Sequence, residues 1–296
     1  IILSIGYLSE HFKRYYQDFS SSEVDITMVE EENPLGTGGA IKKCEYLLDD
    51  YFFLINGDTI FDINYHDLAL SFDENNIAHL ALNFVKDVSR YGNVKTKGNN
   101  VISFEEKIYS NSGYVNSGVG IFNKRIVEFL SLKKTSLEKD VFPILLNKKL
   151  LSAKKYNSFF LDIGIPQALD NAQKSIPKWK CKSALFLDRD GVINVDFGYV
   201  HSMENFKWIY SAKETIKMAN DLGVLVIVIT NQSGIARNFY SEKEFKDFTK
   251  EINNKLIDFG AHIDKTYFCP HHPTEGIGDL KKDCDCRKPK PGLLKK

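Results

Sequence analysis

Two aspartates separated by one residue follow a short apolar run, and this spacing could do chemistry. Asp188 and Asp190 come directly after residues 184–187, which we predict to be a buried strand. Because aspartate is rare within strands, both carboxylates should lie at the carboxyl edge of the sheet, where open α/β folds bind ligands. Two close carboxylates repel each other unless a cation or a proton lies between them. The spacing therefore indicates a divalent metal and catalysis, with a solvated acidic turn as the alternative.

A second polar cluster is expected at the same edge. The sequence Thr-Asn-Gln-Ser-Gly at residues 230–234 follows an apolar run at residues 223–229 that does not alternate. Such a run is typical of a parallel strand covered on both faces. A helix over residues 212–222 connects the two strands and completes a βαβ unit of usual length. The two polar clusters should face one pocket, where hydroxyl, amide and glycine N–H groups suit phosphate oxygens.

A third cluster has the composition of a metal site. Its predicted ligands are Cys269, His271, Cys284 and Cys286. Four soft ligands are enough for a closed tetrahedral zinc site with a structural role, and His272 is the second choice for the nitrogen ligand. Disulfides are the alternative, which the odd number of cysteines (5) and the lack of a secretory signal disfavour. A zinc ion here would fix the loop that carries Arg287 and Lys288.

The three clusters together resemble a known family. The segments 188–193, 230–237 and 286–289 occur in the order seen in the haloacid-dehalogenase superfamily, and most resemble its D-glycero-D-manno-heptose 1,7-bisphosphate 7-phosphatases. The resemblance covers about residues 183–296. Asn238 departs from the glycine usual at that position, and the later Gly-Asp motif of the superfamily, which supplies a further magnesium carboxylate, is not in the sequence.

The resemblance assigns roles to residues whose chemistry suits them. A carboxylate can attack phosphorus, and the family pattern gives this role to Asp188, through an aspartyl-phosphate. Asp190 matches the general acid that protonates the leaving sugar oxygen and then activates water. Magnesium would lie at these two aspartates. The phosphate- and substrate-binding residues would be Thr230, Asn231, Arg287 and Lys288.

The first half of the chain also has an α/β pattern. We expect strands at residues 1–5, 24–29 and 51–55, a helix from Ser9 to about residue 19, and a glycine-rich turn at 35–40 that opens a helix through residue 48. Glycines at a helix start suit phosphate, although most such turns are structural. Asp58 follows the third strand, as Asp188 follows its own, but turn chemistry explains it equally well.

Six motifs in this half resemble the sugar-1-phosphate nucleotidyltransferases. They lie at residues 35–40, 56–58, 90–92, 104–107, 115–118 and 160–164, within residues 1–174. The resemblance implies a Rossmann-like mixed sheet and magnesium at Asp58 and Asp162. It also implies contacts to the nucleotide or the sugar phosphate from Gly36, Gly38, Gly39, Gly57, Gly92, Glu106, Lys107 and Asn116. A solvated charge run is the alternative for residues 105–107.

The two resemblances fit one pathway. We expect a nucleotidyltransferase-like domain over residues 1–174, a solvated linker over 175–182 and a phosphatase domain over 183–296, with both ends truncated. Removal of the 7-phosphate would leave a heptose 1-phosphate, which the first domain would use with a nucleoside triphosphate to make GDP-heptose for lipopolysaccharide. The triphosphate-binding loop of the family is not in the sequence, so we expect no transfer by the chain as given. Alternatives are a histidinol-phosphate or other sugar-phosphate phosphatase, and a non-catalytic sugar-phosphate-binding or scaffold protein.

Composition narrows the possible partners. Basic and acidic residues are equal at 39 each, so the chain has no bias toward nucleic acid. No apolar run reaches 18 residues and no signal peptide is present, which predicts a cytoplasmic protein without a membrane partner. The oligomeric state is left open.

Overall fold

The computed structural model describes residues 1–17, 24–89, 92–105 and 112–295. The chain divides into two compact units. The first consists of Ile1–Thr59 and Ser71–Asn157, and the second of Ile60–Leu70 and Ser158–Lys296. The boundary predicted at residue 174 therefore does not coincide with the division by packing.

A six-stranded mixed sheet forms the centre of the first unit. Its strand order is β3-β8-β5-β9-β7-β6, in which β5 and β9 are parallel and the other neighbours antiparallel. The strands are β3 (Tyr51–Ile55), β5 (Ala78–Val85), β6 (Asn93–Lys97), β7 (Asn100–Glu105), β8 (Gly113–Asn123) and β9 (Leu151–Tyr156). The mixed sheet confirms the fold class predicted for this half.

Shorter elements complete this unit. They are β1 (Ile2–Ile5), α1 (Ser9–Gln17), β2 (Thr27–Glu30), α2 (Gly36–Lys43) and α4 (Phe142–Asn147), and β1 and β2 form a separate parallel pair. Short helical turns cover Glu45–Leu47, Lys124–Phe129 and, in π-helical form, Leu137–Val141. The helix expected after the glycine-rich turn was wrong at its start, because α2 already begins at Gly36 and includes the glycines.

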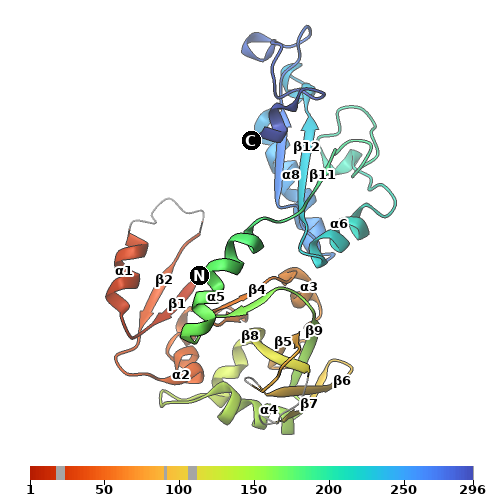
Figure 1. Ribbon diagram of the computed structural model, residues 1–296. Coiled ribbons are helices and arrows are strands. Elements are labelled where there is room, and N and C mark those ends of the chain that lie inside the picture. Colours follow the sequence, from red (N-terminus) through yellow and green to blue (C-terminus); the bar gives the residue numbers. More distant parts are fainter. Residues whose placement is uncertain (18–23, 90–91, 106–111, 296) are drawn as a thin grey trace. The chain divides into compact units, whose positions relative to one another are not determined.

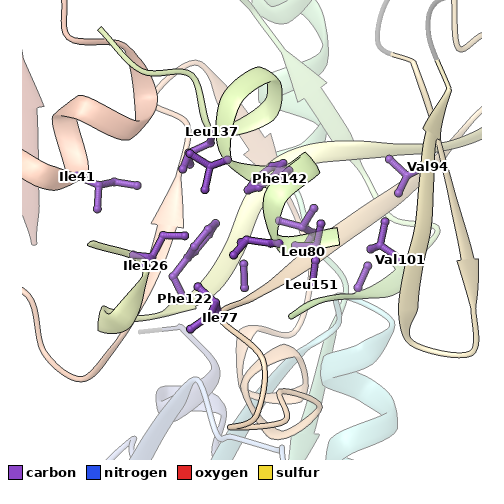
Figure 2. Close-up of a cluster of buried hydrophobic side chains, with 14 of the residues drawn as sticks. Ile41, Ile77, Leu80, Val94, Val101, Phe122, Ile126, Leu137, Phe142 and Leu151 are labelled. Atoms are coloured by element: carbon purple, nitrogen blue, oxygen red, sulfur yellow. The ribbon is translucent and has the colours of Figure 1, made fainter. Parts of the chain in front are cut away.

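The core of the first unit lies where the sheet meets these helices. Figure 2 shows Leu80 and Phe122 from the sheet beside Ile41 of α2 and Phe142 of α4. Six consecutive residues of β5 are buried, so both faces of this central strand are covered. Each Å² of apolar surface removed from water stabilises the folded state by about 25 cal/mol, so this cluster stabilises the unit.

A three-stranded parallel sheet in the order β11-β12-β13 organises the second unit (Figure 1). The helices and strands of this unit are β4 (Thr59–Phe61, of which Thr59 belongs to the first unit), α3 (Tyr65–Leu70), β10 (Phe160–Asp162), α5 (Pro166–Lys180), β11 (Ala184–Leu187), α6 (Ala212–Asp221), β12 (Leu225–Asn231), α7 (Ser233–Ala236), α8 (Glu242–Ile257) and β13 (Lys265–Cys269). Short turns cover Met203–Asn205, Gly278–Leu280 and Pro291–Lys295.

Helix α8 shows why the sequence folds this way. Ser241 caps its N-terminus and forms a capping box with Glu244, which satisfies backbone N–H groups that the helix leaves unpaired. Its buried residues recur every three or four positions and form one apolar stripe: Phe245, Phe248, Ile252 and Leu256. Most of this stripe packs with Ile216 of α6 and with Val226 and Val228 of β12.

Two expectations for this half need correction. The strands of the βαβ unit alternate in burial instead of being covered on both faces, because α6 and α8 pack on the face that carries Val226 and Val228. Phe186, on the alternate positions of β11, is 46% exposed. The solvated linker expected at residues 175–182 is also wrong in form, because α5 continues to Lys180 with Pro177 inside it.

Among the described residues, no helix combines the length and apolar character needed to cross a bilayer.

Candidate active site

The predicted aspartate pair lines a cavity at the carboxyl ends of β11 and β12. This cavity measures about 390 Å³. It is lined by Asp188, Asp190, Asp196, Gly198, Tyr199, Thr230, Asn231 and Ser233. The polar segments that follow the two strands therefore meet at one pocket, as the βαβ pattern predicted, although Thr230 and Asn231 are the last residues of β12 and do not follow it.

Lys288 brings a cation to Asp188 across 100 positions of sequence. Its Nζ lies 2.5 Å from Asp188 Oδ2 and donates to the Ile229 carbonyl at 2.8 Å. The Asn231 side chain fixes the Lys288 backbone, accepting from its N–H at 3.0 Å and donating to its carbonyl at 3.2 Å. Asp188 Oδ1 accepts the Arg189 N–H at 2.8 Å. The ammonium group offsets the charge of the carboxylate and so reduces the repulsion between Asp188 and a phosphate.

Asp190 is held by three neighbouring side chains. Its Oδ1 accepts from Arg189 Nε at 3.1 Å and from Asn194 Nδ2 at 3.0 Å. Arg189 Nη2 lies 2.9 Å from both carboxylate oxygens. Oδ2 also accepts from Gln232 Nε2 at 3.0 Å. The two aspartates thus have different surroundings, which is the arrangement expected for groups with different tasks.

Arg189 is almost completely buried, a finding that was not predicted. Its guanidinium lies 5.6 Å from the ring centre of Phe245 and 5.4 Å from that of Phe248, and it donates to the Val200 carbonyl at 2.6 Å. A buried arginine needs a paired anion, and Asp190 supplies it. Its position between the two aspartates could have indicated this burial, because successive side chains in an extended segment point to opposite sides.

The Cys/His cluster forms as predicted. One ligand atom each from Cys269, His271, Cys284 and Cys286 lies within 4.8 Å of every other, a group that could hold a metal ion. All five cysteines are free, so the disulfide alternative is not realised. Burial raises the pKa of the Cys269 thiol to about 12, so a bound cation would have to displace its proton.

His272 does not join the cluster. Its Nδ1 accepts the N–H groups of Thr274 and Glu275 at 3.4 and 3.0 Å, and its Nε2 lies 3.3 Å from Arg237 Nη2. Arg287 donates to the His271 carbonyl at 3.1 Å, which ties the predicted substrate contact to the cysteine loop. Cys269 and Asn231 are partners in the parallel register of β13 and β12, so the cluster lies beside the segment that was predicted to bind phosphate.

The first unit holds a separate cavity of about 140 Å³. Its lining combines apolar strand residues with the polar residues Thr37, Asn56, Asn116, Ser136 and Glu138. Asn116 Nδ2 donates to Glu138 Oε1 at 2.9 Å. Glu138 was missed because the sequence gives no sign that the π-helical segment 137–141 lies against β8. Its carboxylate and the Asn116 amide can together bind hydroxyl groups of a sugar.

Other residues predicted for the first half have varied outcomes. Asp58 is exposed after β3 and belongs to the first unit, whereas Asp162 belongs to the second and accepts the Gly164 N–H at 2.8 Å. Their shared magnesium stays a prediction. Gly57 faces open space, and Gly92 has a φ of +87° that favours glycine. Glu106 and Lys107 lie outside the described residues.

The glycines of α2 have a packing role that the sequence did not reveal. A Cβ at Gly36 would lie 2.7 Å from the Thr135 carbonyl oxygen, and one at Gly39 would lie 2.8 Å from that of Lys133. A Cβ at Gly38 would lie 3.0 Å from both Leu130 Cδ2 and Thr135 Cγ2. These contacts explain why residues 36, 38 and 39 are glycine, and the nucleotide contact implied by the resemblance stays a prediction.

Comparison with known proteins identifies the first part of the chain. A family model described as nucleotidyl transferase matches residues 1–178, well over half of the sequence. The chain belongs to the nucleotidyl transferase family. The nucleotidyl transferase match ends before β11, and a second model, described as polynucleotide kinase 3 phosphatase, matches residues 187–296.

Relatives of the second part carry a specific name. The D-glycero-beta-D-manno-heptose-1,7-bisphosphate 7-phosphatase of Pasteurella multocida (strain Pm70) is 49% identical over 113 residues, which is 38% of this chain and 61% of the relative. The chain thus spans about three fifths of the length of the curated relatives that it matches. This similarity confirms the predicted likeness to the heptose bisphosphatases.

A solved structure resembles the nucleotidyl transferase part. HddC from Yersinia pseudotuberculosis is 30% identical with a TM-score of 0.54, covering 60% of this chain and 78% of that chain. The same protein complexed with GMP-PN is 31% identical, with the same TM-score and coverage. A nucleotidyl transferase fold followed by a phosphatase-like fold is therefore the architecture of this chain, as predicted.

Proposed function

We propose that this chain belongs to a bifunctional enzyme of nucleotide-sugar synthesis. The second unit hydrolyses the 7-phosphate of D-glycero-D-manno-heptose 1,7-bisphosphate through an aspartyl-phosphate. The nucleotidyl transferase part then transfers a nucleotidyl group from a nucleoside triphosphate to the heptose 1-phosphate. The observation that carries the proposal is that Asp188, Asp190, Thr230 and Asn231 line one cavity with the Lys288 ammonium group 2.5 Å from Asp188.

The first chemical step uses the separate surroundings of the two aspartates. Asp188 attacks phosphorus, and the bond between phosphorus and the sugar oxygen breaks as the acyl phosphate forms. Asp190 gives its proton to the departing sugar oxygen, which avoids the release of an alkoxide. The phosphoryl oxygens carry negative charge during the transfer. They are held by the hydroxyl of Thr230, the amide of Asn231 and the ammonium group of Lys288.

The second step reverses the role of Asp190. The carboxylate takes a proton from water, the water oxygen attacks phosphorus, and the bond between phosphorus and Asp188 breaks. Arg189, Asn194 and Gln232 all donate to Asp190, so its carboxylate keeps one orientation through both steps. General acid–base catalysis of this kind contributes about 10²–10⁴-fold.

Two metals fit the residues present. Magnesium prefers oxygen ligands, and when bound at Asp188 and Asp190 it would neutralise charge between carboxylate and phosphate. Zinc suits the cysteine cluster, because a tetrahedron with Zn–S bonds of about 2.3 Å has edges of about 3.8 Å. The neighbouring sulfur atoms of Cys269, Cys284 and Cys286 are 3.2–3.5 Å apart, close to that geometry. Zinc would fix the loop that carries Arg287 and Lys288.

For the transferase part, the cavity beside Asn116 and Glu138 would take the sugar phosphate. Guanine is the base that we propose, because the similar HddC was solved with GMP-PN. The product of the second unit would then be the sugar phosphate that the first unit uses.

The experiment tests both activities in the full-length protein. Heptose 1,7-bisphosphate and histidinol phosphate are supplied side by side with magnesium, and phosphate release is followed together with ³¹P NMR to identify the phosphate that leaves. GTP is then added, and pyrophosphate release reports nucleotidyl transfer. Preferential loss of the 7-phosphate followed by pyrophosphate release is the expected result.

Other outcomes would redirect the proposal. Faster hydrolysis of histidinol phosphate would change the substrate while keeping the aspartate chemistry. Tight binding of the bisphosphate without phosphate release would leave a non-catalytic binding protein instead.

A further inference from the structure

The buried side chain of Gln232 links the two halves of the phosphatase-like site. It is 2% exposed. Its Nε2 donates to Asp190 Oδ2 at 3.0 Å and to Thr230 Oγ1 at 2.8 Å. One amide group therefore uses both of its N–H bonds, one on the proposed general acid and the other on a residue proposed to hold phosphate.

The orientation of this amide is fixed from its other end. Tyr240 Oη donates to Gln232 Oε1 at 2.6 Å. The carboxyl group of Asp190 accepts from Arg189 and Asn194 as well, so the Gln232 nitrogen faces Asp190 and the Gln232 oxygen faces Tyr240. Burial raises the pKa of Tyr240 to about 12, so its hydroxyl keeps the proton that it donates.

The position of Tyr240 depends in turn on a glycine. A Cβ at Gly234 would lie 2.3 Å from Cε1 of the Tyr240 ring, closer than side chains can approach. The Tyr240 ring also stacks on the His201 ring, with ring centres 4.8 Å apart and an angle of 11° between the ring planes. The glycine in the Gln-Ser-Gly sequence thus gives space for the tyrosine that orients Gln232.

The other partners of Asp190 bond to it from its own loop. Arg189 and Asn194 both belong to that loop, and Arg189 also anchors it by packing on Phe245 and Phe248 of α8. Gln232 follows directly after β12, whose last residues are Thr230 and Asn231. Its hydrogen bonds therefore define the distance between the acid after β11 and the phosphate-binding end of β12.

We propose that Gln232, oriented by Tyr240, is a positioning residue that holds Asp190 in line with the phosphate-binding end of β12. This inference rests on the proposed phosphatase function. It assigns no direct contact with substrate to either residue. It requires both to act on the steps that use Asp190, and it requires Tyr240 to act through Gln232.

The test uses three variants of the full-length protein: Gln232→Met, Tyr240→Phe and the double variant. Tyr210→Phe is the matched control, because this tyrosine is 96% exposed. For heptose 1,7-bisphosphate we expect kcat to fall about 10–100-fold in Gln232→Met, which loses a hydrogen bond to a charged group. Tyr240→Phe should lose about 3–10-fold. KM should stay near the wild-type value in each.

Two readouts separate positioning from a general structural defect. The double variant should be no slower than Gln232→Met, because residues that act in sequence are not additive. With 4-nitrophenyl phosphate, whose leaving group needs no proton, Asp188 should be phosphorylated at a near wild-type rate while its dephosphorylation slows. A burst of nitrophenolate followed by a slower steady state is expected, whereas a general defect would slow both phases.

Several results would overturn the inference. These are an unchanged kcat in Gln232→Met or in Tyr240→Phe, additive losses in the double variant, or a rise in KM alone. If Gln232→Met fails to fold, Tyr240→Phe keeps the ring packing and its burst decides the matter. A wild-type protein that does not hydrolyse the bisphosphate would overturn the proposed function itself, a result distinct from active variants with unchanged rates.

Discussion

The two cavities of this chain differ in how their polar groups are held. At the phosphatase-like cavity, Asp190 accepts from three side chains and Asp188 faces a fixed lysine, so the site is already organised. At the nucleotidyl transferase cavity, Asn116 and Glu138 bond to each other. The first network joins three segments of the chain and orients both carboxylates, whereas the second joins one amide to one carboxylate and leaves more freedom to rearrange around a ligand.

The largest expected effect would break the organised site. Asp188→Asn should abolish phosphate release, because an amide cannot form the acyl phosphate. Asp190→Asn should lose about 10²–10⁴-fold but still form the intermediate. Steady-state release and trapping of the phosphoenzyme measure the two effects, with Asp247→Asn in the surface ion pair with Lys243 as control. Near wild-type hydrolysis by Asp188→Asn would remove the mechanism.

The second prediction tests whether the organised site depends on the cysteine cluster. Cys284→Ser should lose the bound metal and loosen the loop of Arg287 and Lys288, so that phosphatase activity falls well below that of the wild type. Elemental analysis of protein purified without chelator measures the metal. Cys181→Ser is the matched control, since Cys181 is exposed and lies outside the cluster. Wild-type protein without zinc would contradict the assignment.

The third prediction concerns the looser site. Glu138→Gln keeps the shape of the side chain but removes a charged partner of Asn116, and should raise KM for the sugar phosphate about 10-fold with little change at the phosphatase. Pyrophosphate release at varied sugar-phosphate concentration checks this, with the exposed Glu128→Gln as control. An equal loss at both activities would mean that Glu138 supports folding in general.

The smallest expected effect is a dependence of the stability of the first unit on pH. Desolvation lowers the pKa of His79 from 6.5 to about 4, where its ring lies between Ser71 and Ser152 hydroxyls at 2.9 and 2.7 Å. Below pH 6.5 the unfolded chain binds a proton that the folded unit refuses, so stability falls as pH drops from about 6.5 to 4, by at most about 3 kcal/mol.

Denaturant unfolding of the first unit across this range measures the loss. His79→Gln should flatten the pH dependence between pH 4 and 6.5, whereas the exposed His11→Gln should leave it unchanged. The same steepness in His79→Gln and wild type would show that another group is responsible.

The second half was easier to predict than the first, because its motifs are local in sequence. The aspartate pair, the segment 230–234 and the cysteine cluster are each local, and a βαβ connection can place them at only one edge of the sheet. Their meeting at one cavity was therefore predictable. The burial of the two faces of the sheet was less predictable, because the sequence does not show that α6 and α8 pack on the same face.

Partners contributed by distant or unmarked residues escaped prediction. Glu138 reaches Asn116 from a segment 22 positions away, and no pattern marks it as part of a cavity. Gln232 lay inside a predicted motif, but its link to Asp190, 42 positions away, depends on side-chain directions that periodicity does not give. The glycines of α2 suggested phosphate, whereas their observed contacts are with Thr135 and Lys133.

The sequence by itself determined the chemistry available to this protein: two carboxylates after one strand, hydroxyl and amide groups at the end of the next, and four soft metal ligands in one short segment. These follow from residue types and short spacings, which chain connectivity preserves. Only the tertiary structure decided which groups form ion pairs and hydrogen bonds with one another. Arg189 turns inward beneath Asp190 because it packs on Phe245 and Phe248, more than 50 positions away. Gln232, oriented by Tyr240, reaches Asp190 across 42 positions of sequence.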